Sequence, residues 1–204
     1  MSKPLTPDNL EQNGYVKHVH LAHLDLVAFI KQYFFMKNPV TIFYWLFNLL
    51  LVSGGVCFLV LADSAGDSLL KLFFGFFVFF LIVPVHELIH GIGYKLAGAE
   101  KVTYKAVWKQ MVFYAMADRF VANKKQFVLL AIAPFLLINT LFISLFFYLP
   151  EPFSWVSYGA LLMHTAGCSG DFALMSYFYN YWEKNPVTYD DVAGQMSYFY
   201  LKKD

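Results

Sequence analysis

Long apolar stretches separated by short polar ones dominate this chain, and they predict membrane-spanning helices. Four stretches, at about 41–62, 69–97, 126–149 and 153–181, are each long enough to cross the ~30 Å hydrocarbon core of a bilayer. Only short segments separate the first stretch from the second and the third from the fourth, whereas 99–124 is a longer polar connection. We therefore expect an all-α membrane protein with four transmembrane helices.

The residues before the first span, 1–38, are mixed in character. From 15 to 35, apolar positions such as Leu21 and Ile30 alternate with polar ones such as Lys31 in an amphipathic arrangement. An amphipathic helix of this kind lies in the membrane interface with its apolar face in the lipid. We expect such an interfacial helix at the N-terminal side of the first span.

A different periodicity appears between the second and third spans. Over 101–109, apolar side chains such as Val102 and Tyr104 alternate with polar neighbours, and a second apolar run covers 111–117. Alternation with a period of two is typical of a β-strand. We expect a small β-hairpin with its turn near 109–110, and an interfacial loop is the alternative.

These patterns divide the chain into an N-terminal segment (1–38), a transmembrane core (39–181) and a polar tail (182–204). Lysine and arginine gather in the N-terminal segment, the connection 99–125 and the tail, whereas the loop after the first span has none. The loop after the third span carries only the charge of Glu151. Because positively charged loops stay in the cytosol, we expect both termini and the middle connection there.

Composition narrows the classes of partner and compartment. The chain of 204 residues is 59% hydrophobic and has a formal net charge of +1, which gives no field for binding nucleic acid. Its two cysteines, Cys57 and Cys168, both lie in apolar runs, so a disulfide framework is not expected. We interpret both as small apolar packing residues, although Cys168 is close enough in sequence to Asp171 to serve as an additional metal ligand.

Within the second stretch, His86, Glu87 and His90 form an H-E-x-x-H motif in apolar surroundings. Helix positions four apart share a face, so both histidines can offer nitrogens to one Zn²⁺ at about 2.0–2.1 Å. Glu87 lies beside the first ligand, where it can take a proton from a water activated by the metal. Chance is the alternative, but ionisable groups are costly at membrane depth and mark functional sites there.

A catalytic zinc needs a third protein ligand, which the adjoining sequence does not supply. Leu96 stands where a longer zincin motif has its third histidine. The candidates are Glu100, Asp118, His164 and Asp171. At a rise of ~1.5 Å per residue, Asp171 lies at the depth of the histidine pair, whereas Glu100 and Asp118 lie at or outside the interface. Asp171 is the favoured ligand, with an ion-paired or helix-capping aspartate as the alternative.

Two further polar residues, His164 and Asn139, lie deep inside apolar stretches. On one continuous helix His164 is ~10 Å from Asp171, so both bind one ion only if the helix unwinds between them. We expect His164 to donate a hydrogen bond to the substrate or the oxyanion and Asn139 to polarise a substrate carbonyl. Interior hydrogen bonding is the alternative for both.

Together these motifs resemble the site-2-protease-like membrane zincins, and more closely a bacterial family of zincin peptidases formerly described only as a domain of unknown function. The resemblance rests on H-E-L-I-H-G at 86–91, A-P-F at 133–135 and S-G-D at 169–171, and it covers roughly 40–180. It implies a bacterial protein of the cytoplasmic membrane. Site-2 proteases carry a Leu-Asp-Gly motif at the third ligand, where this chain has Gly-Asp-Phe.

The resemblance further implies a zinc site made by His86, His90 and Asp171, with Glu87 as general base. The function expected on this basis is hydrolysis of peptide bonds in membrane-associated or transmembrane substrates, with the lipid bilayer as the surrounding partner. A non-catalytic zinc-binding sensor or scaffold needs the same ligands without Glu87. Metal transport is disfavoured, because four spans offer no second layer of ligands.

Overall fold

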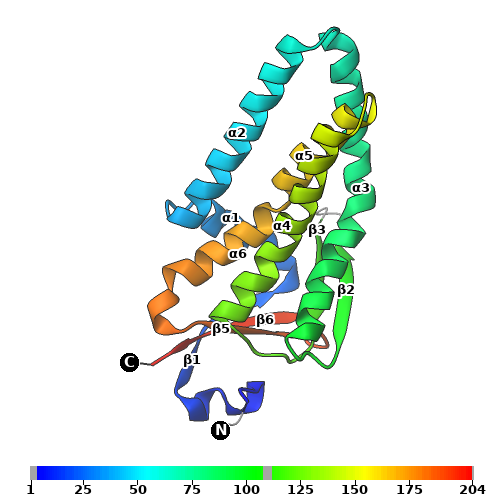
Figure 1. The fold of residues 1–204 in the computed structure, drawn as a ribbon. Helices are drawn as coiled ribbons and strands as arrows, with labels where there is room; N and C mark the ends of the chain where they lie inside the picture. Colours follow the sequence, from blue (N-terminus) through cyan, green and yellow to red (C-terminus); the bar gives the residue numbers. More distant parts are fainter. Residues whose placement is uncertain (1–3, 108–111, 204) are drawn as a thin grey trace.

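The computed structural model describes residues 4–107 and 112–203, and it places a set of helices above two small β-sheets (Figure 1). Three helices are long and two are short. They are α2 (Pro39–Leu61), α3 (Ala65–Leu96), α4 (Lys124–Tyr148), α5 (Phe153–Gly167) and α6 (Ser169–Asn180). The short helix α1 (Leu26–Phe34) packs against α6 at the lower end of the helices.

The strands gather below the helices. One sheet has four antiparallel strands in the order β1-β6-β5-β4, and the other is the hairpin β2-β3. Their bounds are β1 (Tyr15–Ala22), β2 (Val102–Val107), β3 (Val112–Ala117), β4 (Ala122–Asn123), β5 (Val187–Asp191) and β6 (Met196–Lys202). Short 3-10 turns complete the described chain: η1 (Pro7–Asn9), η2 (Glu11–Asn13), η3 (His23–Asp25) and η5 (Trp182–Lys184).

In the part of the chain that the structure describes, the three long helices α2, α3 and α4 are long and apolar enough to cross a membrane. Many large hydrophobic side chains on these helices are exposed, including Leu50, Leu81 and Leu137. An exposed apolar surface of this extent needs a nonaqueous partner. These features indicate a membrane protein.

The fourth expected span, 153–181, is not one helix. It consists of α5 and α6, which are 15 and 12 residues long and are separated at Cys168. Helices of these lengths extend about 22 Å and 18 Å, less than the ~30 Å hydrocarbon core. The expectation of a single continuous fourth helix is therefore wrong, and the expected four-span topology does not follow from the fold.

The prediction of an interfacial helix over 15–35 is also wrong for the first half of this segment. Residues Tyr15–Ala22 form β1, which pairs antiparallel with β6, and only Leu26–Phe34 is helical. Val19 and Leu21 alternate with polar neighbours at the strand period of two, and β6 supplies the backbone partners that make the strand stable. The polar tail at 182–204 provides that partner.

The β-hairpin expected between the second and third spans is present as β2 and β3, which pair from Val102 with Ala117 to Val107 with Val112. Its expected turn at 109–110 lies outside the described residues. The two strands run beside the lower half of α3 (Figure 1). The connection between the second and third spans is therefore held against the helix that carries the H-E-x-x-H motif.

Helices α3 and α5 cross closely because each has a glycine at the crossing. A Cβ atom on Gly75 would overlap the carbonyl oxygen of Val156, and one on Gly159 would overlap the carbonyl oxygen of Leu72. Small residues allow two helix backbones to approach in this way inside a membrane. The crossing brings the C-terminal part of α5 alongside the middle of α3, where His86 lies.

Candidate metal centre

Helix α3 presents His86 and His90 on one face, as positions four apart on a helix require. The Nε2 atoms of the two rings are 3.0 Å apart, and their planes meet at 74°. His90 is buried and His86 is nearly so. The two nitrogens thus point to the same small volume from one helix.

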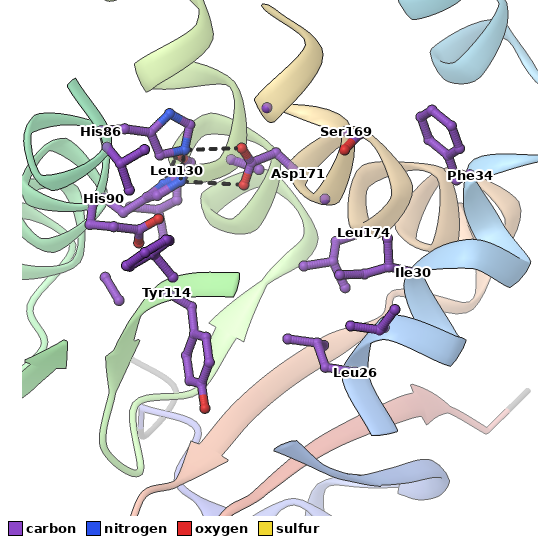
Figure 2. Close-up of a pocket in the computed structure, with 18 of the residues that line it drawn as sticks. Leu26, Ile30, Phe34, His86, His90, Tyr114, Leu130, Ser169, Asp171 and Leu174 are labelled. Carbon is purple, nitrogen blue, oxygen red and sulfur yellow. Dashed lines mark hydrogen bonds and ion pairs between the residues drawn. The ribbon is translucent and has the colours of Figure 1, made fainter. Parts of the chain in front are cut away.

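The break between α5 and α6 brings Asp171 to these histidines (Figure 2). Helix α5 ends at Gly167, and the backbone N–H of Cys168 donates to the carbonyl oxygens of His164 and Thr165. Asp171 then lies in the first turn of α6. Its Oδ2 is 3.2 Å from His86 Nε2 and its Oδ1 is 3.3 Å from His90 Nε2.

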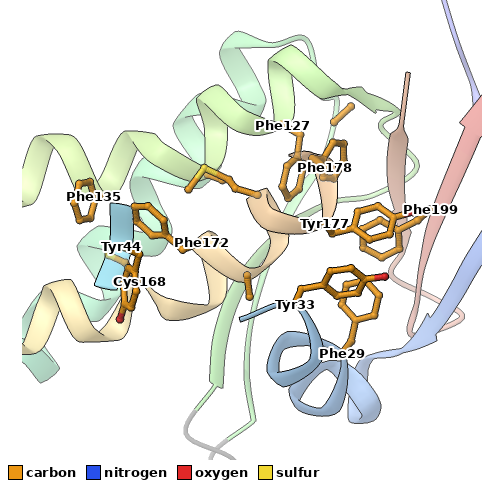
Figure 3. Close-up of a cluster of buried hydrophobic side chains, with 14 of the residues drawn as sticks. Phe29, Tyr33, Tyr44, Phe127, Phe135, Cys168, Phe172, Tyr177, Phe178 and Phe199 are labelled. Carbon is orange, nitrogen blue, oxygen red and sulfur yellow. The ribbon is translucent and has the colours of Figure 1, made fainter. Parts of the chain in front are cut away.

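Packing of aromatic side chains holds α6 in this position. The interior side of α6 contributes Phe172, Tyr177 and Phe178 to a buried cluster that also includes residues of α1, α4 and β6 (Figure 3). The rings of Phe127 and Phe178 stack with centroids 4.1 Å apart. Because aromatic side chains bury large areas in fixed orientations, the start of α6 is anchored by the rest of the helix.

The three side chains fit a zinc ion. Two imidazole nitrogens and a carboxylate oxygen are ligands that Zn²⁺ takes in catalytic sites. Ligands at about 2.05 Å from a tetrahedral ion are about 3.3 Å from one another. The two nitrogens are 3.0 Å apart, close to this edge, and each lies 3.2 or 3.3 Å from a different carboxylate oxygen of Asp171, so one ion can bind both nitrogens and the carboxylate and still leave a position open.

A proline in α4 leaves free the carbonyl of Leu130, which orients His90. His90 Nδ1 lies 2.9 Å from the carbonyl oxygen of Leu130, to which it donates when Nε2 faces the metal. Pro134 follows Leu130 by four residues and has no N–H, so this carbonyl has no donor within its own helix. Partners of this kind fix the ring and tautomer of metal-binding histidines.

His164 and Asn139 orient His86 through its Nδ1 atom, on the side of the ring away from the candidate metal position. His86 Nδ1 is 3.1 Å from His164 Nε2, and His164 Nδ1 is 2.6 Å from Asn139 Oδ1. A consistent set of protons has His86 donating to His164 and His164 donating to Asn139. His164 and Asn139 therefore lie on the side of His86 that is turned away from Asp171, and not across the site from it.

Glu87 faces the same site from α3, and the hairpin closes over it. Its Oε2 is buried and has no hydrogen-bond partner among the described residues, which leaves a proton acceptor beside the three ligand atoms. Gly91 allows the hairpin to approach, because a Cβ atom there would overlap the hydroxyl of Tyr104 in β2. The last residue of the H-E-L-I-H-G motif is thus explained by hairpin docking.

A cavity of about 570 Å³ opens onto the site. His86, His90 and Asp171 meet at one side of it, and the remaining wall is largely apolar (Figure 2). Glu87 also lines the cavity. The apolar wall comes from α1, from the strand β3 and from α6, together with residues of α3 and α4. It includes Leu26, Ile30, Phe34, Tyr114 and Leu174.

The other third-ligand candidates lie away from this cluster. Asp118 Oδ1 accepts a hydrogen bond of 3.1 Å from the backbone N–H of Val192, at the edge of the four-stranded sheet. Glu100 is exposed beyond the end of α3. His164 contacts the Nδ1 atom of His86, whereas Asp171 contacts the Nε2 atom on the other side of the same ring.

Sequence reasoning missed two contributors to the site. The carbonyl of Leu130 could have been found from Pro134, because a proline inside a helix always frees the carbonyl four residues before it. The sequence pattern does not place α1 at the cavity wall, because the position of α1 depends on the pairing of β1 with β6.

Comparison with known proteins gives a family for the chain. A family described as "putative zincin peptidase" matches residues 79–184, more than half of the 204 residues. The match includes all three candidate ligands and the whole of the α5–α6 break. No curated protein and no solved structure matches the chain significantly. Zincins use zinc, in agreement with the donor set of the site, and this chain belongs to the zincin peptidase family.

Proposed function

We propose that this protein is a membrane-embedded zinc metalloprotease that cuts membrane-associated or transmembrane substrates. The observation that carries the proposal is the meeting of His86, His90 and Asp171 at zinc-ligand separations, with the unpartnered oxygen of Glu87 beside them. A site that only held zinc structurally would be closed by a fourth protein ligand.

The chemistry divides between the metal and the chain. His86, His90 and Asp171 would hold a zinc ion, which would supply Lewis-acid chemistry for the scissile carbonyl and lower the pKa of a water molecule. Glu87 takes the proton of the attacking water and delivers it to the nitrogen of the leaving amine. His164 and Leu130 hold the rings of His86 and His90, so the ligand nitrogens stay aimed at one point.

The substrate must present an extended backbone, because the carbonyls of a helix are hydrogen-bonded internally. Strand β3 contributes Tyr114 and Ala115 to the cavity wall beside the site. A peptide segment that unwinds can add to such a strand through main-chain hydrogen bonds. The apolar wall formed by α1 and α6 then contacts the side chains next to the scissile bond. We infer that cleavage occurs near the cytosolic face of a bacterial cytoplasmic membrane.

The test uses full-length protein in liposomes with model substrates that have one transmembrane segment and a glycine- and asparagine-rich stretch near one end. Glu87→Gln should retain zinc and lose cleavage, whereas Asp171→Asn should lose both. Glu100→Gln, an exposed glutamate beyond the same helix, is the matched control and should keep both. Products are identified by mass spectrometry and zinc by atomic absorption.

Two results would contradict the proposal. Cleavage that survives Glu87→Gln removes the general base from the mechanism. Stoichiometric zinc without cleavage of any model substrate would instead favour a non-catalytic zinc sensor or scaffold.

A further inference from the structure

A second group of ligand-type atoms lies behind His86. His86, His164 and Cys168 each offer a nitrogen or sulfur atom that lies within 4.8 Å of the other two. The two nitrogens are 3.1 Å apart, and Cys168 Sγ is 3.9 Å from His164 Nε2. His164 and Cys168 are buried, with 1% and 0% of their surfaces exposed. The last turn of α5 places this cysteine beside the histidine, because Cys168 follows His164 by four residues and its N–H donates to the His164 carbonyl.

These separations suit a thiophilic cation. With Zn–N at about 2.05 Å and Zn–S at about 2.3 Å, tetrahedral geometry separates two nitrogens by about 3.3 Å and a nitrogen from a sulfur by about 3.6 Å. The His86–His164 and His164–Cys168 separations of 3.1 and 3.9 Å each differ from these values by a few tenths of an ångström. Thiolate and imidazole ligands favour zinc, cobalt and softer ions over magnesium or calcium.

We propose that His86, His164 and Cys168 form a second metal site, the rear site, which binds a thiophilic divalent cation such as Zn²⁺. The site formed by His86, His90 and Asp171 is the front site. The two nitrogens of the His86 ring face opposite ways, so the ring serves one ion from each side. The rear site depends on the proposed function only in one respect, that His86 is a ligand of both sites.

Charge and access both permit a second ion. Two dications in a buried site need compensating negative charge. The carboxylates of Asp171 and Glu87, the thiolate of Cys168 and a deprotonated His86 ring together supply four negative charges. The cavity of about 570 Å³ that opens onto the front site is also lined by His164 and by Gly167, the residue before Cys168.

Occupancy of the rear site changes how His86 is held. The second cation displaces the thiol proton of Cys168 and the proton that His86 shares with His164, and both protons leave to solvent. A coordinate bond from His86 Nδ1 then replaces its hydrogen bond to His164. The two sites are therefore coupled, because each ion changes the ligand that the other uses.

The test is titration of the metal-free full-length protein with Co²⁺ in detergent. We expect two equivalents to bind, one of them with a thiolate-to-cobalt charge-transfer band in the near ultraviolet. Cys168→Ser should lose this band and bind one equivalent. Cys57→Ser is the matched control, because Cys57 is exposed on α2, and it should keep the band and both equivalents.

A wild-type protein without the band, or a band that persists in Cys168→Ser, would overturn the rear site. If Cys168→Ser does not fold, X-ray absorption of the wild type with two equivalents of zinc decides the question. We expect sulfur at about 2.3 Å from zinc, and a shell of only nitrogen and oxygen would overturn the proposal. Neither measurement involves cleavage, so failure of the protease proposal is detected separately.

Discussion

Replacing Pro134 by alanine should weaken zinc binding although this residue contacts no metal. The variant gains an N–H that points along α4 to the carbonyl of Leu130, the acceptor for His90 Nδ1 at 2.9 Å. Loss of a partner of this kind lowers metal affinity about 10–100-fold. A carbonyl oxygen has two lone pairs and can serve both donors in part, so we expect the lower end, about tenfold or 1.4 kcal/mol.

The measurement is competition for zinc between the full-length protein and a chromophoric chelator in detergent. Leu137→Ala, on the exposed side of the same helix, is the control for general effects on α4 and should leave the affinity unchanged. Circular dichroism verifies that both variants keep their helices. A Pro134→Ala protein whose zinc affinity differs by less than about twofold from the wild type would refute the role given to the Leu130 carbonyl.

Two further predictions concern stability and are measured as thermal midpoints in detergent. Gly159→Ala should destabilise the protein by about 1–3 kcal/mol or more, because its Cβ overlaps the backbone of Leu72. Gly66→Ala, where a Cβ meets open space, should not. Burial and the carboxylate of Asp118 raise the pKa of Asp190 from 3.8 to about 6, so its charge costs stability above that pH. Asp190→Asn should therefore raise the thermal midpoint at neutral pH. This gain should shrink as the pH falls through about 6, because the wild-type carboxyl group then becomes neutral as well. A gain that grows as the pH falls would contradict the raised pKa of Asp190.

The three long helices are predictable from the sequence because each is an apolar stretch of bilayer length. Their observed bounds lie within a few residues of the expected ones, and α2 begins at Pro39 where about 41 was expected. The β2–β3 hairpin is predictable for a similar reason, since its period of two contrasts with the helices on both sides. Local pattern determines these elements, and tertiary contacts adjust only their ends.

Elements that depend on distant partners are not predictable in this way. Strand β1 is a strand because β6, about 180 residues later, pairs with it, and the N-terminal pattern alone reads equally well as an amphipathic helix. The break at Cys168 follows no proline, and its flanking glycines are compatible with a continuous helix. At the site, spacing and depth predict Asp171 near His86 and His90, whereas the side of His86 on which His164 lies depends on how α5 crosses α3, which no local pattern shows.

The candidate ligands belong to two different packing units of the protein. His86 and His90 lie on α3, whose Leu72 and Ile89 pack in a cluster with α5 and the later part of α4, whereas Asp171 starts α6, which packs in another cluster with α1, the sheet and the earlier part of α4. An ion at the front site would therefore cross-link the two units. Because aromatic packing alone already holds the start of α6 near the histidines, an ion bound there would join the two units more firmly and raise the thermal midpoint of the folded protein.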